Sequence, residues 1–197
     1  MKTTLIARAL VVVIPIAIGS AACAAPVGEP GRSDEALSAS NCPDDVPDVL
    51  APAADQKLRS IVIGDGVQIY ECTSTGWVFR FPEAVLLDPG GEVVGTHYAG
   101  PTWRADDGST MVGARAAGAT VDPASIPWLL LNVVSHTGDG RFANITSIQR
   151  LSTVGGLAPT GGCDATTVGT FARVPYTAEY FLYQTDNGSP GNNAQCR

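Results

Sequence analysis

The chain has 197 residues, is 45% hydrophobic and 16% charged, and carries a formal net charge of −7. Its length suits a single domain with a hydrophobic core of its own. Its 12 lysines and arginines are scattered through an acidic sequence, so no basic patch can neutralise phosphates, and we exclude nucleic acid as a partner.

The first residues predict an export signal. Lys2 and Arg8 are followed by an apolar run over residues 9–18 and by small residues at 19–22. This run is shorter than the roughly 20 apolar residues of a transmembrane helix and is typical of a signal peptide. We therefore predict a signal peptide at 1–22, and removal of its two positive charges leaves −7 − 2 = −9.

Two cleavage sites remain open. Ala22-Cys23-Ala24 fits an ordinary signal peptidase that cuts after Ala24, whereas residues 20–23 resemble a lipobox that would make Cys23 the lipidated first residue. Ser20 departs from the Leu, Val or Ile that lipoboxes prefer. Residues 23–40 are rich in Pro, Gly, Ser and Ala, as in a flexible tether. We favour a lipoprotein anchored to the membrane through Cys23, and the alternative is a secreted domain.

Residues 41–197 predict an all-β domain, an antiparallel sandwich or barrel. Short stretches alternate polar with apolar or β-branched residues, turn residues separate them, and no long helical period intervenes. The expected strands are 59–63, 67–72, 77–80, 84–87, 92–97, 126–134, 145–152 and 176–183, with two short strands framing 106–108. Only residues 44–57 are expected to hold a helical turn.

Three local features refine this expectation. Gly64-Asp65-Gly66 predicts a hairpin turn between the first two strands. Pro82 predicts a break between the next two, because proline cannot donate a hydrogen bond to a neighbouring strand. The continuous apolar run at 126–134 predicts a strand buried on both faces, with Trp128 in the core.

Eight motifs resemble the exported DUF3455 family in order and spacing, across about residues 49–184. They lie at 66–72, 94–103, 107–109, 126–131, 148–150, 153–156, 162–164 and 174–176. That family is functionally uncharacterised, so the resemblance implies a fold and export but no reaction.

Some relatives in that family carry a malate dehydrogenase label. Residues 138–143 are the part of this sequence that could support such an activity. They fit the dinucleotide pattern G-x-G-x-x-A, which functions only where the glycines lead from a strand into a helix. Here alternating β-branched residues follow, which favours a hairpin turn. We predict no nicotinamide site and no other cofactor.

Four cysteines remain once Cys23 is set aside. Cys72 and Cys163 both lie in motifs shared with the family, and the resemblance implies that they form a disulfide. Cys42 and Cys196 lie at opposite ends of the domain and are expected to pair as a terminal staple. No C-x-x-C spacing occurs, so we predict no metal site.

Residues 95–113 form the stretch densest in polar and aromatic groups, and they contribute to a candidate ligand site. Its predicted residues are His97, Tyr98, Trp103, His136 and Arg150. We expect His97 and Trp103 to face a common cavity, with Trp103 at its rim, together with the strand that carries Gln149 and Arg150. The alternative is that Trp103 plugs the end of the core.

Gln149 and Arg150 are adjacent on an alternating strand, so their side chains are expected on opposite faces. An inward-facing Arg150 would have to be paired, and it would indicate an anion site.

Two function classes follow. The first is a non-catalytic module that binds an unknown small molecule or a surface partner. The second is a small-molecule hydrolase or metal-dependent enzyme that uses His97 and His136. No G-x-S-x-G elbow or other complete catalytic signature occurs, so we assign no catalytic residue and favour the binding module. Imidazoles far apart or on opposite faces would argue against the enzyme.

Overall fold

The computed structural model describes residues 42–186 and 195–196. The predicted signal peptide, the lipidation site at Cys23 and the tether at 23–40 lie outside these residues. Within the described part of the chain, no helix is both long enough and apolar enough to cross a membrane.

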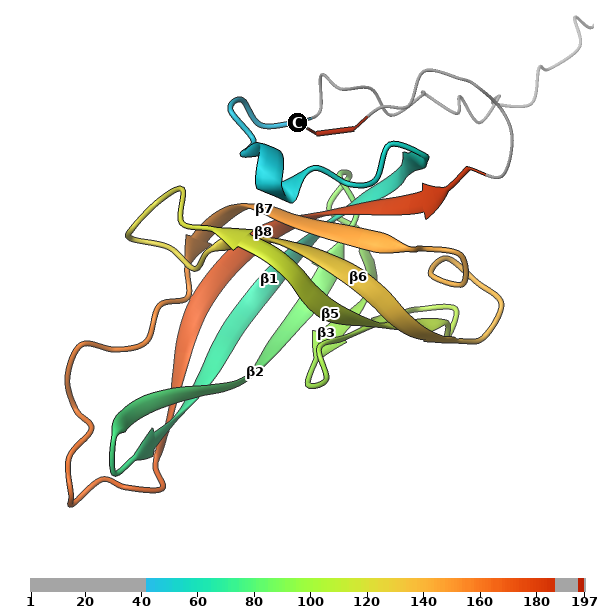
Figure 1. Cartoon of the computed structure of the whole chain (residues 1–197). Helices are drawn as coiled ribbons and strands as arrows, with labels where there is room; N and C mark the ends of the chain where they lie inside the picture. The colour runs from blue at the N-terminus through green and yellow to red at the C-terminus, as the bar shows by residue number, and fades with distance from the viewer. Residues whose placement is uncertain (1–41, 187–194, 197) are drawn as a thin grey trace, which may run out of the picture. The chain divides into compact units, whose positions relative to one another are not determined.

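Eight antiparallel strands form one closed barrel in which each strand pairs with its neighbours in sequence and β8 pairs back with β1 (Figure 1). The strands are β1 (Gln56–Thr73), β2 (Gly76–Leu87), β3 (Val93–Tyr98), β4 (Thr102–Ala105), β5 (Thr110–Ala119), β6 (Trp128–Thr137), β7 (Ser147–Gly155) and β8 (Phe171–Thr185). The all-β prediction is confirmed, and the architecture is the barrel. The expected helical turn is the 3-10 helix η2 (Asp48–Leu50).

Alternation along the strands produces two apolar clusters, one inside the barrel and one outside it. The interior cluster includes Trp103, Met111, Leu131 and Tyr180. A second cluster contains Leu50, Leu58, Trp128, Leu151, Phe181, Tyr183 and Cys196. It lies on the outer faces of the strands, where the segments around Leu50 and Cys196 cover them, and it confirms Trp128 as a core residue.

Gln149 anchors these terminal segments to the outer face of β7. It is fully buried, and its Nε2 donates to the backbone oxygens of Leu50 at 2.7 Å and Cys196 at 2.9 Å. Its Oε1 accepts a 2.6 Å hydrogen bond from the Tyr183 hydroxyl. The amide is thus satisfied on both sides, as a buried polar group requires.

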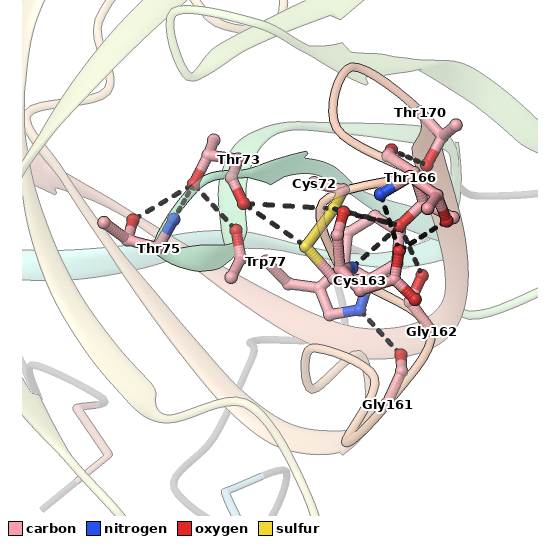
Figure 2. The surroundings of a disulfide bond; sticks show 12 residues. Cys72, Thr73, Thr75, Trp77, Gly161, Gly162, Cys163, Thr166 and Thr170 are labelled. Carbon is pink, nitrogen blue, oxygen red and sulfur yellow. Dashed lines mark hydrogen bonds between the residues drawn. A yellow bond between two sulfur atoms is a disulfide. The ribbon is translucent and has the colours of Figure 1, made fainter.

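Both predicted disulfides are confirmed. Cys42 is bonded to Cys196, and Cys72 at the end of β1 is bonded to Cys163 in the loop between β7 and β8 (Figure 2). The Trp77 indole adds a 2.9 Å hydrogen bond to the Gly161 oxygen of the same loop. The Cys72–Cys163 bond spans a sequence separation of 91 residues. In the chain-entropy model, closing a loop of this length stabilises the folded protein by about 4 to 5 kcal/mol. Such bonds persist in oxidising, extracytoplasmic compartments.

The predicted turn at Gly64-Asp65-Gly66 is wrong, because β1 runs through it without interruption. These glycines serve close packing instead. A Cβ on Gly66 would lie 2.1 Å from the Glu83 backbone oxygen, and one on Gly64 would lie 2.6 Å from the Tyr180 ring. Only glycine allows β1 to approach β2 and the interior aromatics this closely.

The predicted break at Pro82 is also wrong, since β2 is continuous from Gly76 to Leu87. Pro82 pairs with Gln68 of β1, and β2 pairs with β3 only from Ala84 onward. The side of Pro82 that lacks a donor therefore faces no strand, which is where a sheet tolerates proline.

The prediction that residues 126–134 are buried on both faces is wrong as well. Strand β6 buries Trp128 and Leu131, but Val134 is 61% exposed. In an antiparallel barrel the outer face is covered only where another segment lies over it, and the terminal segments cover only the start of β6.

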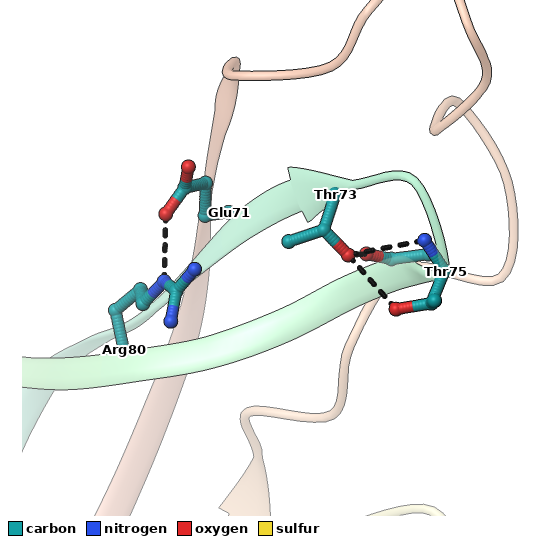
Figure 3. A network of polar contacts seen from close by, with 5 residues as sticks. Glu71, Thr73, Thr75 and Arg80 are labelled. Atoms are coloured by element: carbon teal, nitrogen blue, oxygen red, sulfur yellow. Dashed lines mark hydrogen bonds and ion pairs between the residues drawn. The ribbon is translucent and has the colours of Figure 1, made fainter.

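The far end of the β1–β2 hairpin is held by polar side chains at the surface (Figure 3). Arg80 donates to Glu71 at 2.7 Å, and the Thr73 hydroxyl contacts that of Thr75 at 3.0 Å. Exposed pairs of this kind contribute at most about 1 kcal/mol. They orient the hairpin but do not determine the fold.

Candidate ligand cavity

A cavity of about 210 Å³ lies in the barrel interior. Its walls come from all eight strands and the β3–β4 turn: Gln68, Phe79, Pro82, His97, Pro101, Trp103, Gly113, Ala114, Arg115, Leu129, Leu131, Arg150 and Tyr180. An eight-stranded barrel has an interior that side chains can fill or that can hold one small ligand. The sizes of the inward-facing residues decide whether the interior is filled or keeps room for a ligand.

The cavity reaches solvent where the barrel wall is short. Strands β3 and β4 have six and four residues, whereas β1, β2 and β8 continue side by side well beyond them (Figure 1). The first half of β2 therefore pairs only with β1, and β5 from Gly113 onward pairs only with β6. The half-exposed Phe79 and the exposed Arg115, which stand on these two edges, mark the mouth.

His97 and Trp103 form one wall of the cavity, as the sequence predicted. They are cross-strand partners, and their rings stack with centroids 4.1 Å apart and planes at 19°. Tyr180 meets both rings edge-on. A Cβ on Gly113 would lie 3.0 Å from the Trp103 ring, so the glycine leaves room for the indole. Trp103 is only 1% exposed, however, so it is an interior wall and core residue and not a rim residue.

The His97 imidazole is held in the neutral form. Burial lowers its pKa to about 3, and the positive charge of Arg150 acts in the same direction. Its Nδ1 lies 2.9 Å from the Thr102 oxygen, and because a carbonyl can only accept, Nδ1 carries the proton. A group that binds protons this weakly is a poor general base near neutral pH.

Gln149 and Arg150 lie on opposite faces of β7, as predicted, and it is Arg150 that points into the barrel. Its Nε and Nη2 donate to the Pro127 oxygen at 3.2 and 2.7 Å. No described residue supplies a carboxylate to it, since the ion pairs formed there are Lys57–Asp186, Arg80–Glu71 and Arg173–Glu83. Burial lowers the pKa of Arg150, and Arg115 lowers it further. The expected pairing partner of this charge is thus not found among the described residues.

Two donors on residues that line the cavity have no protein acceptor. The side-chain Nε2 of Gln68 and the indole Nε1 of Trp103 are buried and make no hydrogen bond with any described residue. Gln68 is 3% exposed. Buried polar groups almost always have a partner, so two such donors at one cavity are unusual.

The other two predicted site residues lie elsewhere. Tyr98 is 38% exposed and borders a second, more open groove, which is also lined by His97, Asp65, Glu83 and Arg173. His136 is exposed, and its Nε2 donates to the Ile145 oxygen at 2.7 Å. Strands β4 and β5 separate β3 from β6, and the two imidazoles bond to different backbone oxygens, those of Thr102 and Ile145.

Two residues that line the cavity, Gln68 and Tyr180, were not among the predicted site residues. Gln68 has the same parity on β1 as the inward-facing Val62, so its alternation would have placed it inside the barrel. Because a turn was predicted at 64–66, Val62 and Gln68 were assigned to different strands, and their shared parity was not apparent. Tyr180 follows the same rule on β8, together with Tyr176, Ala178 and Leu182.

Replacing His97 with glutamine should flatten the acid dependence of stability. Because the unfolded imidazole titrates near 6.5 and the folded one near 3, the unfolded chain binds an extra proton between these values. Stability is complete above about pH 6.5 and falls below it by up to about 1.4 kcal/mol per pH unit. Urea unfolding of the wild type and His97→Gln between pH 7 and pH 5 measures this slope.

His136→Gln is the matched control, because it removes the exposed imidazole and leaves His97 in place. The slope should persist in this control. Equal slopes in wild type and His97→Gln would contradict the neutral, buried state of His97.

Comparison with known proteins identifies a family for this chain. No curated protein and no solved structure matches it. One family, described as "Protein of unknown function (DUF3455)", matches over residues 52–184, a span that runs from before β1 into β8 and includes every residue that lines the cavity. The chain therefore belongs to the DUF3455 family.

Proposed function

We propose that this protein is an extracytoplasmic module that binds a small molecule inside its barrel and catalyses no reaction. One observation carries the proposal: one solvent-connected cavity is lined by Arg150, whose charge has no carboxylate partner among the described residues, and by Gln68 and Trp103, which each carry a buried N–H without an acceptor. A fold that serves only stability gains nothing from such groups, since burying an unpaired donor costs about 1 to 3 kcal/mol. A bound acceptor would offset this cost.

The enzyme alternative has less support. His97 is neutral and proton-poor, and the exposed His136 stands on β6, with two strands between it and β3. No group of three or more histidine, cysteine or acidic side chains in the described part of the chain could hold a metal ion. The cavity therefore offers recognition groups and no activated nucleophile.

Native mass spectrometry of the full-length protein, purified from its own host in detergent, tests binding. We expect a co-purifying small molecule that is lost in Ala114→Trp, which places a bulky ring at the cavity mouth. Ala116→Trp is the control, because Ala116 is also exposed on β5 but does not line the cavity. The molecule, added in excess, should be recovered unchanged. Turnover, or equal retention by both variants, would overturn the proposal.

We also propose that Cys23 carries a lipid that holds the protein at the cell membrane. Cys23→Ser should move the protein from the membrane fraction to the soluble fraction or the medium, because the acylated residue is then lost. Ser20→Leu is the control, since it restores a preferred lipobox residue and should retain the anchor. Fractionation followed by immunoblotting measures the distribution, and an unchanged distribution in Cys23→Ser would contradict lipidation.

A further inference from the structure

We propose that the cavity binds the carboxylate of a small organic acid, with Arg150 as its main charge partner and the apolar walls around the rest of the molecule. This inference rests on the proposed binding function and specifies its ligand class.

The charge of the cavity is opposite to that of the chain. The protein carries a net charge of −7, yet the cavity is lined by Arg115 and Arg150 and by no aspartate or glutamate. The two guanidinium groups repel one another, which lowers the pKa of Arg150. An anion placed beside Arg150 would relieve this repulsion and give the guanidinium the partner that the described residues do not supply.

The cationic and the unsatisfied groups that line the cavity are all donors. The guanidinium can only donate, as can the indole N–H of Trp103, and the unsatisfied atom of Gln68 is its amide nitrogen. A carboxylate is acceptor-only, with about four lone-pair positions on two oxygens. It therefore matches a cavity lined by one guanidinium and two unsatisfied N–H donors, whereas an amine or a metal cation would face groups of the wrong polarity.

The remaining walls are apolar and select an organic body. Leu129, Leu131, Pro82 and Phe79 line the cavity beside the stacked His97–Trp103 pair. Its volume of about 210 Å³ exceeds the roughly 150 Å³ of an engineered apolar cavity that binds benzene. Space thus remains for one ring or short chain together with a carboxylate. An inorganic oxyanion would satisfy the donors but leave the apolar walls without a contact.

Calorimetric titration of the full-length wild type with benzoate, benzamide and inorganic phosphate tests the inference. Benzoate and benzamide share a ring and differ in charge, so they isolate the carboxylate. We expect benzoate to bind at least about tenfold more tightly than benzamide, and phosphate to bind more weakly than benzoate. Arg150→Gln should weaken benzoate by about tenfold or more and leave benzamide within about threefold.

Two further variants keep the test decisive. Arg104→Gln removes the same charge from the outer face of β4 and should leave benzoate binding unchanged. Arg150→Lys retains a charge without the planar fork and should show an intermediate loss. If Arg150→Gln does not fold, two other results test the inference: benzoate binding by Arg150→Lys, and the comparison of benzoate with benzamide in the wild type.

The outcomes separate this inference from the proposed function. Equal binding of benzoate and benzamide, both abolished by Ala114→Trp, would overturn the carboxylate assignment and leave the binding module intact. Tightest binding of phosphate would replace the organic acid with an oxyanion. Binding of none of the three, together with a non-acidic molecule in the native preparation, would overturn the ligand class. Binding of none, with nothing in the native preparation, would overturn both.

Discussion

Replacing Trp103 with alanine should lower the free energy of unfolding by about 3 to 5 kcal/mol, which is typical of truncating a large buried aromatic side chain. The indole is 1% exposed, stacks on His97 and meets Tyr180 edge-on. Its loss removes these contacts and merges the space with the existing cavity. Urea unfolding monitored by circular dichroism measures the change.

Trp103→Phe separates the structural contribution of this residue from its contribution to binding. Phenylalanine retains an aromatic ring in the core but lacks the N–H that has no protein acceptor. We expect a smaller stability loss than in Trp103→Ala, together with weaker benzoate binding. A change of less than about 1 kcal/mol in Trp103→Ala would contradict its place in the core. Unchanged benzoate affinity in Trp103→Phe would remove the indole N–H from the proposed site.

Replacing Gly66 with alanine should cost about 3 kcal/mol or more, at the upper end of overpacking effects. The added Cβ would lie 2.1 Å from the Glu83 oxygen and 2.5 Å from the Ala84 Cα, which are backbone atoms of the paired strand. A side chain could rotate away, but β2 can yield only by breaking its pairing with β1. The midpoint of urea unfolding reports the loss.

Gly161→Ala is the matched control for this substitution. A Cβ at Gly161 meets nothing within 4 Å, and the backbone there is not in the left-handed region. Its stability should stay close to that of the wild type. A wild-type midpoint in Gly66→Ala would show that the close approach of β1 to β2 is not required.

The fold class could be predicted from alternation, and the failures have one physical cause. Gly64, Gly66 and Pro82 are turn-forming residues in isolation, yet here they lie within long strands. Glycine also permits close approach between strands, and proline is accepted where a strand has no neighbour on one side. Both conditions depend on which strands become neighbours, so local sequence does not reveal them.

The site could be predicted in part for a related reason. His97, Trp103 and Arg150 were identified from a dense polar and aromatic stretch and from strand parity, and the cavity brings them together. Tyr98 follows His97 directly and therefore points to the opposite face. Gln68 comes from a strand far away in sequence, and only closure of the barrel brings it to the same cavity.

The Cys42–Cys196 bond has a mechanical consequence. It joins the two ends of the domain across a sequence separation of 154 residues, a length of chain that would extend by roughly 500 Å if fully stretched. A pulling force applied at these ends would pass through one covalent bond and bypass the strand pairs of the barrel. Stretching should therefore leave the cavity intact and its ligand bound until a reductant cleaves that bond. The force would then act on the strand pairs and separate them.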